Sequence, residues 1–411
     1  MQAMKPALPD IQTMVRELVR HPSVSSVQPD LDMPNTAVCE LLGAWLEDLG
    51  FSVRIDPVPG HAGKTNLVAT LGRGDDGLVL SGHADTVPWD EHRWDTDPFA
   101  GTVRDGRLYG LGATDMKAFF AAACHAASRF RAGQFRRPLV ILATADEESG
   151  MSGARALADA GDRLGACAVI GEPTGLAPVT LHKGILMEAI RLVGRSGHSS
   201  DPALGRSALE GMLEVADELG RFREDLQARW PSPAFDVPYP TLNLGRIAGG
   251  DNPNRICGEC ELLIDVRLVP GMTVAETRRE LRARVRDRLG GSGLELQFRP
   301  LFEGVDPMRD TSGTAHAERC CRLSGAGTGA VAFGTEAPFF QTLGMDTLVM
   351  GPGDIRLAHQ PNEFVELDEV SRCADLLERL IHEYCLAPRT ISPTPCSVNG
   401  TWPCCGIPVR R

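Results

Sequence analysis

The chain has 411 residues, more than one compact core usually holds, so its length predicts two domains. It carries 42 Lys and Arg against 54 Asp and Glu, and this acidic balance excludes a nucleic-acid binder that depends on a basic surface. There is no apolar run that could cross a bilayer, no start resembling a signal peptide and no regular cysteine spacing. We therefore expect a cytoplasmic protein with reduced thiols.

The first predicted element is an amphipathic helix within residues 1–21. One face of it carries five apolar residues at helical spacing: Ile11, Met14, Val15, Leu18 and Val19. From there to about Pro178, apolar runs typical of buried strands alternate with helical segments. This alternation predicts an α/β fold, a mostly parallel sheet covered by helices, and such sheets bind ligands at the carboxyl ends of their strands.

The apolar run LVLSGHAD ends in polar residues and predicts a strand that delivers His83 and Asp85 to that edge. Side chains two residues apart point the same way along a strand, so Asp85 can reach the imidazole of His83 and orient it as a metal ligand. The pair alone is weak, because a histidine at a strand end is often only hydrogen-bonded.

Asp115 follows the glycine-rich turn LYGLGATDMK and precedes the apolar segment AFFAAACHAA, which predicts a buried helix. A carboxylate at this junction could simply cap the helix. Its two oxygens could also bridge two cations, which an imidazole with one free nitrogen cannot do.

Acidic residues and a second histidine end three further apolar segments. The strand PLVILATADEESG ends in Glu147 and Glu148, and adjacent carboxylates repel unless a cation or a shared proton compensates. The strand ACAVIGEPT presents Glu172, which by itself would be an ordinary glutamate in a strand-to-loop turn. His359 lies in the loop GPGDIRLAHQPNE.

Counting these ligands favours a catalytic site for two metal ions over a coincidental acidic surface. Two histidines and three carboxylates give each zinc ion an imidazole and a terminal carboxylate, with one bridging carboxylate and a position left open for water. Glu147 remains after the ligands are assigned, so we expect it to be the general base that takes a proton from this water.

The sequence changes in character at about residue 180. Strand-like stretches and two long helical stretches follow, and from about Leu294 the chain returns to the first domain, because His359 must reach the same metals as His83. We expect catalytic parts at 1–179 and 293–388, an inserted α+β domain at 180–292 that can hinge over substrate, and a loose extension at 389–411. A metal role for the cysteines of this extension is a weak possibility: Cys396, Cys404 and Cys405.

Seven motifs, in this order and spacing, closely resemble the aminoacylase and carboxypeptidase family of two-zinc amidohydrolases: GHADTVP, DMK, ADEESG, GEPT, SGHSSDP, FGTEAPFF and GPGDIRLAHQPNE. The resemblance covers about residues 10 to 387. It implies that one zinc is held by His83, Asp115 and Glu172, and the other by Asp115, Glu148 and His359. It also implies Glu147 as the acid/base and Asp85 as the partner of His83.

The same resemblance implies substrate-binding residues outside the metal centre. His198, which without the family would be a solvated loop residue, is expected to reach the active site of a second subunit in a homodimer. Asn254 matches a position that contacts substrate. Arg267, otherwise an ordinary strand residue, is expected to bind a substrate carboxylate with its planar fork. Thr335 and Glu336 are expected at the substrate, with Glu336 receiving a cationic side chain.

The resemblance implies hydrolysis of the amide of an N-acyl amino acid, with N2-acetyl-L-ornithine as the first candidate, by an enzyme with two Zn²⁺ ions per subunit that Co²⁺ can replace. The alternatives are another N-acyl-amino-acid deacylase, a succinyl-diaminopimelate desuccinylase, a metallodipeptidase, or a binding protein that kept the fold without the chemistry. One departure from the family pattern is Ala118, where glycine usually follows DMK.

Overall fold

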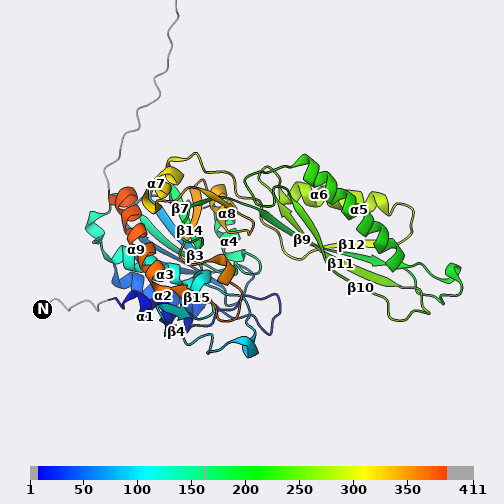
Figure 1. Ribbon diagram of the computed structural model, residues 1–411, viewed down its shortest axis with the longest axis horizontal. Coiled ribbons are helices and arrows are strands. Elements are labelled where there is room, and N and C mark those ends of the chain that lie inside the picture. The colour runs from blue at the N-terminus through cyan, green and yellow to red at the C-terminus, as the bar shows by residue number, and fades with distance from the viewer. Residues whose placement is uncertain (1–7, 162, 387–411) are drawn as a thin grey trace, which may run out of the picture.

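The computed structural model describes residues 8–161 and 163–386, and it has two lobes side by side (Figure 1). The larger lobe holds an eight-stranded sheet in the order β1-β2-β6-β3-β7-β14-β8-β13. Its strands are β1 (Ser52–Pro57), β2 (Thr65–Leu71), β3 (Leu78–His83), β6 (Leu139–Thr144), β7 (Cys167–Pro173), β8 (Val179–His182), β13 (Gly329–Val331) and β14 (Asp346–Gly351). The central strands β6, β3, β7 and β14 are parallel. The expected α/β class is therefore confirmed.

Helices cover both faces of this sheet, because two clusters of buried apolar side chains lie on opposite sides of it. The longer helices are α1 (Ile11–Val19), α2 (Thr36–Asp48), α3 (Ala118–Ser128), α4 (Ser152–Ala160), α7 (Ala315–Ser324), α8 (Ala337–Thr342) and α9 (Leu367–Ile381). Helix α1 buries four of the five apolar residues expected on its inner face. A small sheet of β4 (Thr102–Arg104), β5 (Arg107–Tyr109) and β15 (Phe364–Glu366) lies beside α9.

Short helical turns complete the chain: η1 (Glu91–Arg93), η2 (Ala113–Lys117), η3 (Ala132–Gln134), η4 (Pro202–Leu204), η5 (Ile355–Leu357) and η6 (His382–Leu386). None of the helices within the described ranges is long and apolar enough to span a membrane. The cysteines of the same ranges are free thiols. The extension at 389–411, with its three cysteines, lies outside the described residues.

The second lobe, residues 184–300, is a four-stranded antiparallel sheet in the order β10-β11-β9-β12. It comprises β9 (Gly184–Val193), β10 (Thr241–Gly249), β11 (Glu259–Leu268), β12 (Glu295–Pro300), α5 (Ala208–Arg229) and α6 (Val274–Arg288). Its strands and helices bury a core of their own. The domain limits remain a prediction, and since β12 still pairs with β9, we propose to move the second limit from residue 292 to residue 300.

The two connections between the lobes lie against each other. The N–H of Ile185 donates to the carbonyl of Val305 at 2.8 Å, and the N–H of Val305 donates back at 2.9 Å. The N–H of Met308 also donates to the carbonyl of His182. This paired crossing places the first residues of β9 beside the carboxyl edge of the large sheet, where the candidate site lies.

Candidate metal centre and substrate cavity

Strand β3 places His83 at the carboxyl edge of the large sheet. The strand is buried along its whole length and pairs in parallel with β6 and β7. His83 is 1% exposed. Its Nδ1 lies 3.1 Å from the backbone carbonyl of Asp85 and can donate a proton there, so Nε2, which faces Asp115, is the nitrogen that a metal ion would bind in place of a proton.

Asp85 orients this imidazole differently from the expectation. The backbone carbonyl of Asp85 accepts the hydrogen bond, whereas its carboxylate Oδ1 is 3.8 Å from Nδ1 of His83. The other oxygen, Oδ2, accepts from the N–H of Glu148 at 3.1 Å. The Asp85 side chain thus connects the end of β3 to the turn that follows β6.

Asp115 lies between the two histidines. Its Oδ1 is 3.0 Å from Nε2 of His83, and its Oδ2 is 3.3 Å from Nε2 of His359. Burial favours a raised pKa for this carboxyl, but the hydrogen bonds with His359 and His83 outweigh it and hold the pKa below its usual range. Asp115 does not cap α3, which has no side-chain cap. One carboxylate oxygen facing each imidazole is the arrangement that a bridging ligand requires.

The remaining acidic residues extend this row on both sides. Glu172 Oε2 is 3.9 Å from Nε2 of His83, and Glu148 Oε2 is 3.1 Å from Nε2 of His359. Ligand atoms of two groups, each within 4.8 Å of one another, could hold a metal ion: His83 with Glu147 and Glu172, and His83 with Asp115 and Glu148. The side chains expected from sequence as ligands therefore lie together at one edge of the sheet.

The charge of this cluster fits a cation site. Burial and the neighbouring acidic groups raise the pKa of Glu172 and of Glu147 well above their usual range. Bound cations would relieve this repulsion, and imidazole nitrogen and carboxylate oxygen are the donors that Zn²⁺ accepts.

Glu147 is partly buried and lines a cavity of about 610 Å³ beside the ligands. The main lobe contributes Asp115, Glu148, Glu172 and His359 to its wall. The second lobe contributes three residues, Ile185, Met187 and Arg267. The Arg267 Nε donates to Asp265 Oδ2 at 3.1 Å, which holds the guanidinium in this wall.

Two residues that the sequence did not single out hold the backbone around the candidate metal centre in place. Glu363 is buried, and its carboxylate accepts from the N–H groups of Gly112, Thr114 and Asp115 at 3.0, 2.8 and 3.1 Å. Lys117 is also buried and donates to the carbonyl of His21 at 2.8 Å. The one feature of the sequence that pointed to them was their place in the motifs: Glu363 is the last residue of HQPNE, and Lys117 is the last residue of DMK.

Ala118, the departure from the family pattern, is the first residue of α3 and has ordinary helical angles, φ −62° and ψ −28°. Its methyl group is buried in the main core. A side chain is compatible with this backbone conformation, so the substitution leaves the helix start and Asp115 in place.

Thr335 and Glu336 lie outside the cavity wall. Thr335 is 0% exposed and its Oγ1 accepts from the N–H of Ala337 at the start of α8. Glu336 is 1% exposed and bonds to Thr144 at the end of β6. The neighbouring Phe333 and Gly334 line the cavity instead. Substrate contact by Thr335 and Glu336 remains a prediction, which this burial does not favour.

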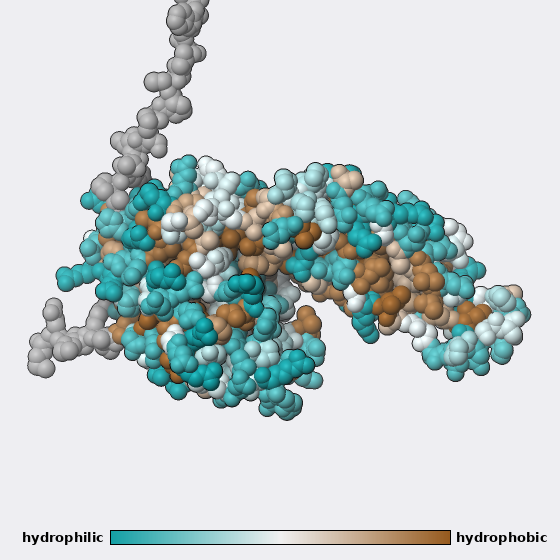
Figure 2. All heavy atoms as spheres, in the orientation of Figure 1, coloured by the Kyte–Doolittle hydropathy of each residue, from teal (hydrophilic) through white to brown (hydrophobic). Residues whose placement is uncertain are grey.

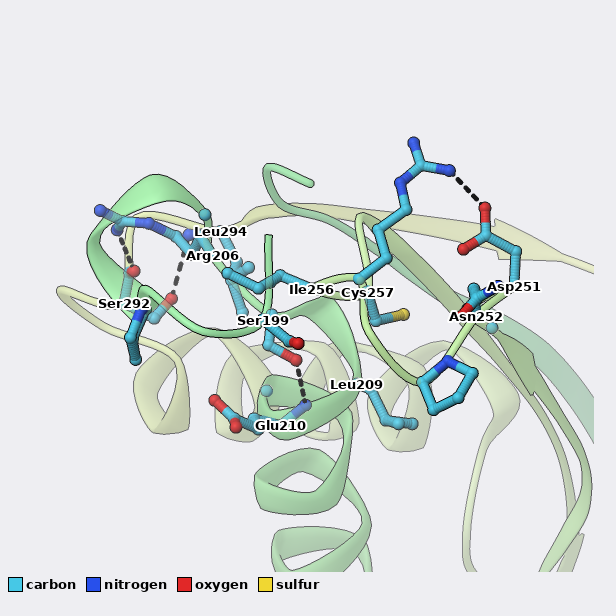
Figure 3. Close-up of a pocket in the computed structure, with 18 of the residues that line it drawn as sticks. Ser199, Arg206, Leu209, Glu210, Asp251, Asn252, Ile256, Cys257, Ser292 and Leu294 are labelled. Atoms are coloured by element: carbon cyan, nitrogen blue, oxygen red, sulfur yellow. Dashed lines mark hydrogen bonds and ion pairs between the residues drawn. The ribbon is translucent and has the colours of Figure 1, made fainter. Parts of the chain in front are cut away.

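His198 and Asn254 belong to the second lobe and are exposed. The carbonyl of Asn254 accepts from the N–H of Ser199, so the two loops that carry them are joined. Their sequence neighbours Ser199 and Arg255 line a cavity of about 960 Å³ between the start of α5 and the loop after β10, which Figure 3 shows. This larger cavity shares no lining residue with the one that contains Glu147.

Parallel strands that end in imidazoles and carboxylates around a cavity define a class, hydrolases with a candidate metal centre. Residues 79–383 match the model of peptidase family M20/M25/M40, and the chain belongs to this family. The resemblance to amidohydrolases is thereby confirmed. The chain is 44% identical over 385 residues to the acetylornithine deacetylase of Salmonella arizonae, an alignment that covers 93% of this chain and 100% of that protein.

Solved structures show the same fold. A metallo-carboxypeptidase of the M20 family from Sulfolobus solfataricus aligns with a TM-score of 0.73 at 18% identity, covering 91% of this chain and 99% of its own. A dinuclear metal-binding peptidase of the family from Bacillus subtilis aligns with a TM-score of 0.61 at 16% identity, covering 90% and 96%. At sequence identities this low, the similarity establishes the fold but says nothing about the substrate.

Proposed function

We propose that the protein removes the acetyl group from N2-acetyl-L-ornithine, giving L-ornithine and acetate, as in arginine biosynthesis. The observation that carries this proposal is the 44% identity, over nearly all of both chains, to a protein that bears this activity in its name. The wall of the cavity supports it, since acidic groups lie beside Arg267, which suits an amide whose amino acid carries a free carboxylate. We also propose a cytoplasmic location, which suits the free thiols of the described residues.

We propose two Zn²⁺ ions at the row of ligands, one held by His83, Asp115 and Glu172 and the other by Asp115, Glu148 and His359, with Co²⁺ as a possible substitute. The positions of these side chains support this, because the two oxygens of Asp115 lie 3.0 Å from Nε2 of His83 and 3.3 Å from Nε2 of His359. When bound, such cations lower the pKa of a water molecule and polarise the acyl carbonyl.

Glu147 is the general acid/base in this mechanism. It takes a proton from the attacking water while the water oxygen bonds to the acyl carbon, and it gives this proton to the nitrogen as the C–N bond breaks. Burial and the nearby Glu172 raise the pKa of Glu147, which suits a group that must take a proton and then release it. Arg267 holds the α-carboxylate, which fixes the scissile amide beside Glu147.

We further propose a homodimer in which His198 of each subunit reaches the cavity of the other and stabilises the developing oxyanion. Within one chain Ser199, the residue after His198, lines a different cavity from Glu147. Large apolar side chains are exposed on α5 and β10 of the second lobe, namely Leu209, Leu213, Leu244 and Ile247 at 40%, 61%, 41% and 52%. Figure 2 shows hydrophobic residues on the surface of this lobe. A second copy would cover them.

A substrate panel tests the reaction. Purified protein with added zinc or cobalt is assayed on acetyl-ornithine, acetyl-citrulline, succinyl-diaminopimelate and a dipeptide, and its metal content is measured in parallel. We expect the highest kcat/KM for acetyl-ornithine. A preference for the succinyl compound or the dipeptide would overturn the substrate while leaving amide hydrolysis intact. Turnover of none of the four by metal-loaded protein would favour a binding protein.

A further inference from the structure

Glu336 has a buried carboxyl group, and very few hydrogen-bond donors surround it. It precedes α8 and is 1% exposed. Its Oε2 is 2.8 Å from the hydroxyl of Thr144, the last residue of β6. Its Oε1 has no hydrogen-bond partner among the described residues.

Another buried carboxyl of this edge, Asp146, is solvated by the protein in a different way, and the hydroxyl groups around it hold its pKa below the usual range. Asp146 accepts from the hydroxyls of Ser25, Ser149 and Ser152 at 2.5, 2.8 and 2.7 Å. Three donors are what a buried carboxylate needs in place of water. Glu336 has one candidate donor, so its environment suits the neutral acid.

The hydroxyl of Thr144 supplies a second argument. It lies 2.8 Å from Glu336 Oε2 and also 3.1 Å from the carbonyl oxygen of Gly82 in β3. A hydroxyl has one proton to donate, and a carbonyl oxygen can only accept. Both contacts are hydrogen bonds at once only if Glu336 carries the proton and donates to Thr144, while Thr144 donates to Gly82.

The charges around Glu336 favour the same state. Burial raises the pKa of Glu336 to about 7 and Asp85 adds to this shift, whereas the nearby His83, and a hydrogen bond that Thr144 would donate to the ionised carboxylate, oppose it. Glu147, which follows β6, is a further charged group that interacts with Glu336. Asp85 and Glu147 are both acidic and disfavour a further carboxylate beside them.

We propose that Glu336 keeps its proton in the folded protein and, through Thr144, holds the ends of β3 and β6 together as a positioning residue. These ends lead directly to His83 and to Glu147. A neutral carboxylic acid outside the cavity offers no charge to an ammonium group, so this role replaces the expected one of receiving a cationic substrate side chain. This proposal depends on the proposed function in its kinetic test alone, because that test measures turnover of the proposed substrate.

The charge state is measured on metal-loaded protein by infrared difference spectroscopy between the wild type and Glu336→Gln at pH 6. We expect the carbonyl stretch of a protonated carboxylic acid to be lost in the variant, with no loss of a carboxylate band. The opposite pattern would overturn the proposal. Because no substrate is involved, this result stands whether or not acetyl-ornithine is hydrolysed.

Unfolding gives an independent reading. A carboxyl whose folded-state pKa is raised from 4.5 to about 7 stabilises the fold fully below pH 4.5, and this contribution is lost as the pH rises through 7. The melting temperature of the wild type relative to Glu336→Gln should therefore fall between pH 5 and pH 8. A difference that does not change with pH, or that grows in favour of the wild type, contradicts the proposal.

Kinetics separate positioning from substrate binding. Glutamine can donate to Thr144, so Glu336→Gln should keep kcat within about threefold, whereas Glu336→Leu should lower kcat by about tenfold with KM little changed. Thr144→Val should resemble Glu336→Leu, and Thr144→Ser should restore activity. A selective rise in KM for basic substrates in Glu336→Gln would return Glu336 to the role of an ammonium receptor.

Discussion

Glu147 and Glu148 are neighbours in sequence but have different surroundings, and this difference separates their roles. Glu148 lies 3.1 Å from His359, and its backbone N–H donates to Asp85. Both carboxyls line the cavity, and burial raises the pKa of each, but of the two only Glu148 is hydrogen-bonded to a histidine. Among the described residues Glu147 has no such bond, which leaves its carboxyl available for the proposed acid/base role.

Replacing Glu147 by glutamine removes this proton carrier while preserving size and polarity. We expect kcat to fall by about 100- to 10,000-fold, because general acid/base groups contribute this much. The metal content should stay at the wild-type value, since Glu147 is not a ligand in the proposed mechanism. Steady-state kinetics and metal analysis of the same preparation check both points, and wild-type turnover in this variant would refute the mechanism.

Among the elements, the loop after η5 and the turn η2 form one unit around Asp115. Glu363 lies four residues after His359 and accepts from the N–H groups on both sides of Asp115's turn. The same carboxylate therefore connects the loop that carries His359 to the backbone of Asp115, the proposed bridging ligand. Burial of Lys117 nearby lowers the pKa of its ammonium group to about 7, while Asp85 and Glu363 oppose this shift.

Glu363→Gln should loosen this unit. An amide has one acceptor oxygen and places N–H donors against backbone donors, so buried N–H groups lose their partners, and the free energy of unfolding should fall by about 1–3 kcal/mol. We also expect a weaker affinity for added zinc, measured by titration. Glu366→Gln is the matched control, because Glu366 is 43% exposed and pairs with Arg107 at the surface, where about 0–1 kcal/mol is expected. Equal losses in both variants would contradict the role of Glu363.

The sequence predicted the residues at the strand ends because period and burial decide where a buried strand stops. His83, Glu148 and Glu172 follow apolar runs, so their arrival at one edge was predictable. The partner of His83 was predicted less well, because the chain turns after β3 and presents the backbone of Asp85 rather than its carboxylate. Glu363 was missed because its partners lie about 250 residues earlier in the chain, a pairing that no local pattern encodes.

At the scale of the whole molecule, both lobes contribute to the cavity. Arg267 reaches it from β11 of the second lobe, whereas the proposed ligands come from the main lobe. The side chain of Arg267 is 30% exposed and is held by Asp265. The relative placement of the lobes therefore decides whether one substrate molecule can contact Arg267 and the candidate metal centre at the same time.

Arg267→Ala should raise KM by about 10- to 100-fold for N-acetyl amino acids, because a charge-assisted pair with the α-carboxylate is lost. A substrate with a neutral carboxamide in place of that carboxylate should be affected far less. Arg246→Ala, on the neighbouring strand β10 with 63% exposure and outside the cavity, is the matched control and should change neither constant. Equal effects of Arg267→Ala on both substrates would remove Arg267 from carboxylate binding.

The proposed sharing of His198 between subunits makes a prediction that no single-chain mechanism makes. Glu147→Gln and His198→Ala should each be nearly inactive as homodimers. In a mixed dimer, the site with an intact Glu147 belongs to the His198→Ala chain, and it receives the intact His198 of the other chain. Co-expression with two different tags and random pairing should therefore restore about a quarter of wild-type activity, since half of the dimers are mixed and each has one complete site. If His198 acted within its own chain, every site in the mixed dimer would lack one group and no activity would return. A mixed dimer that stays inactive, although both tags are recovered together, would show that the second lobe does not complete the site of its partner.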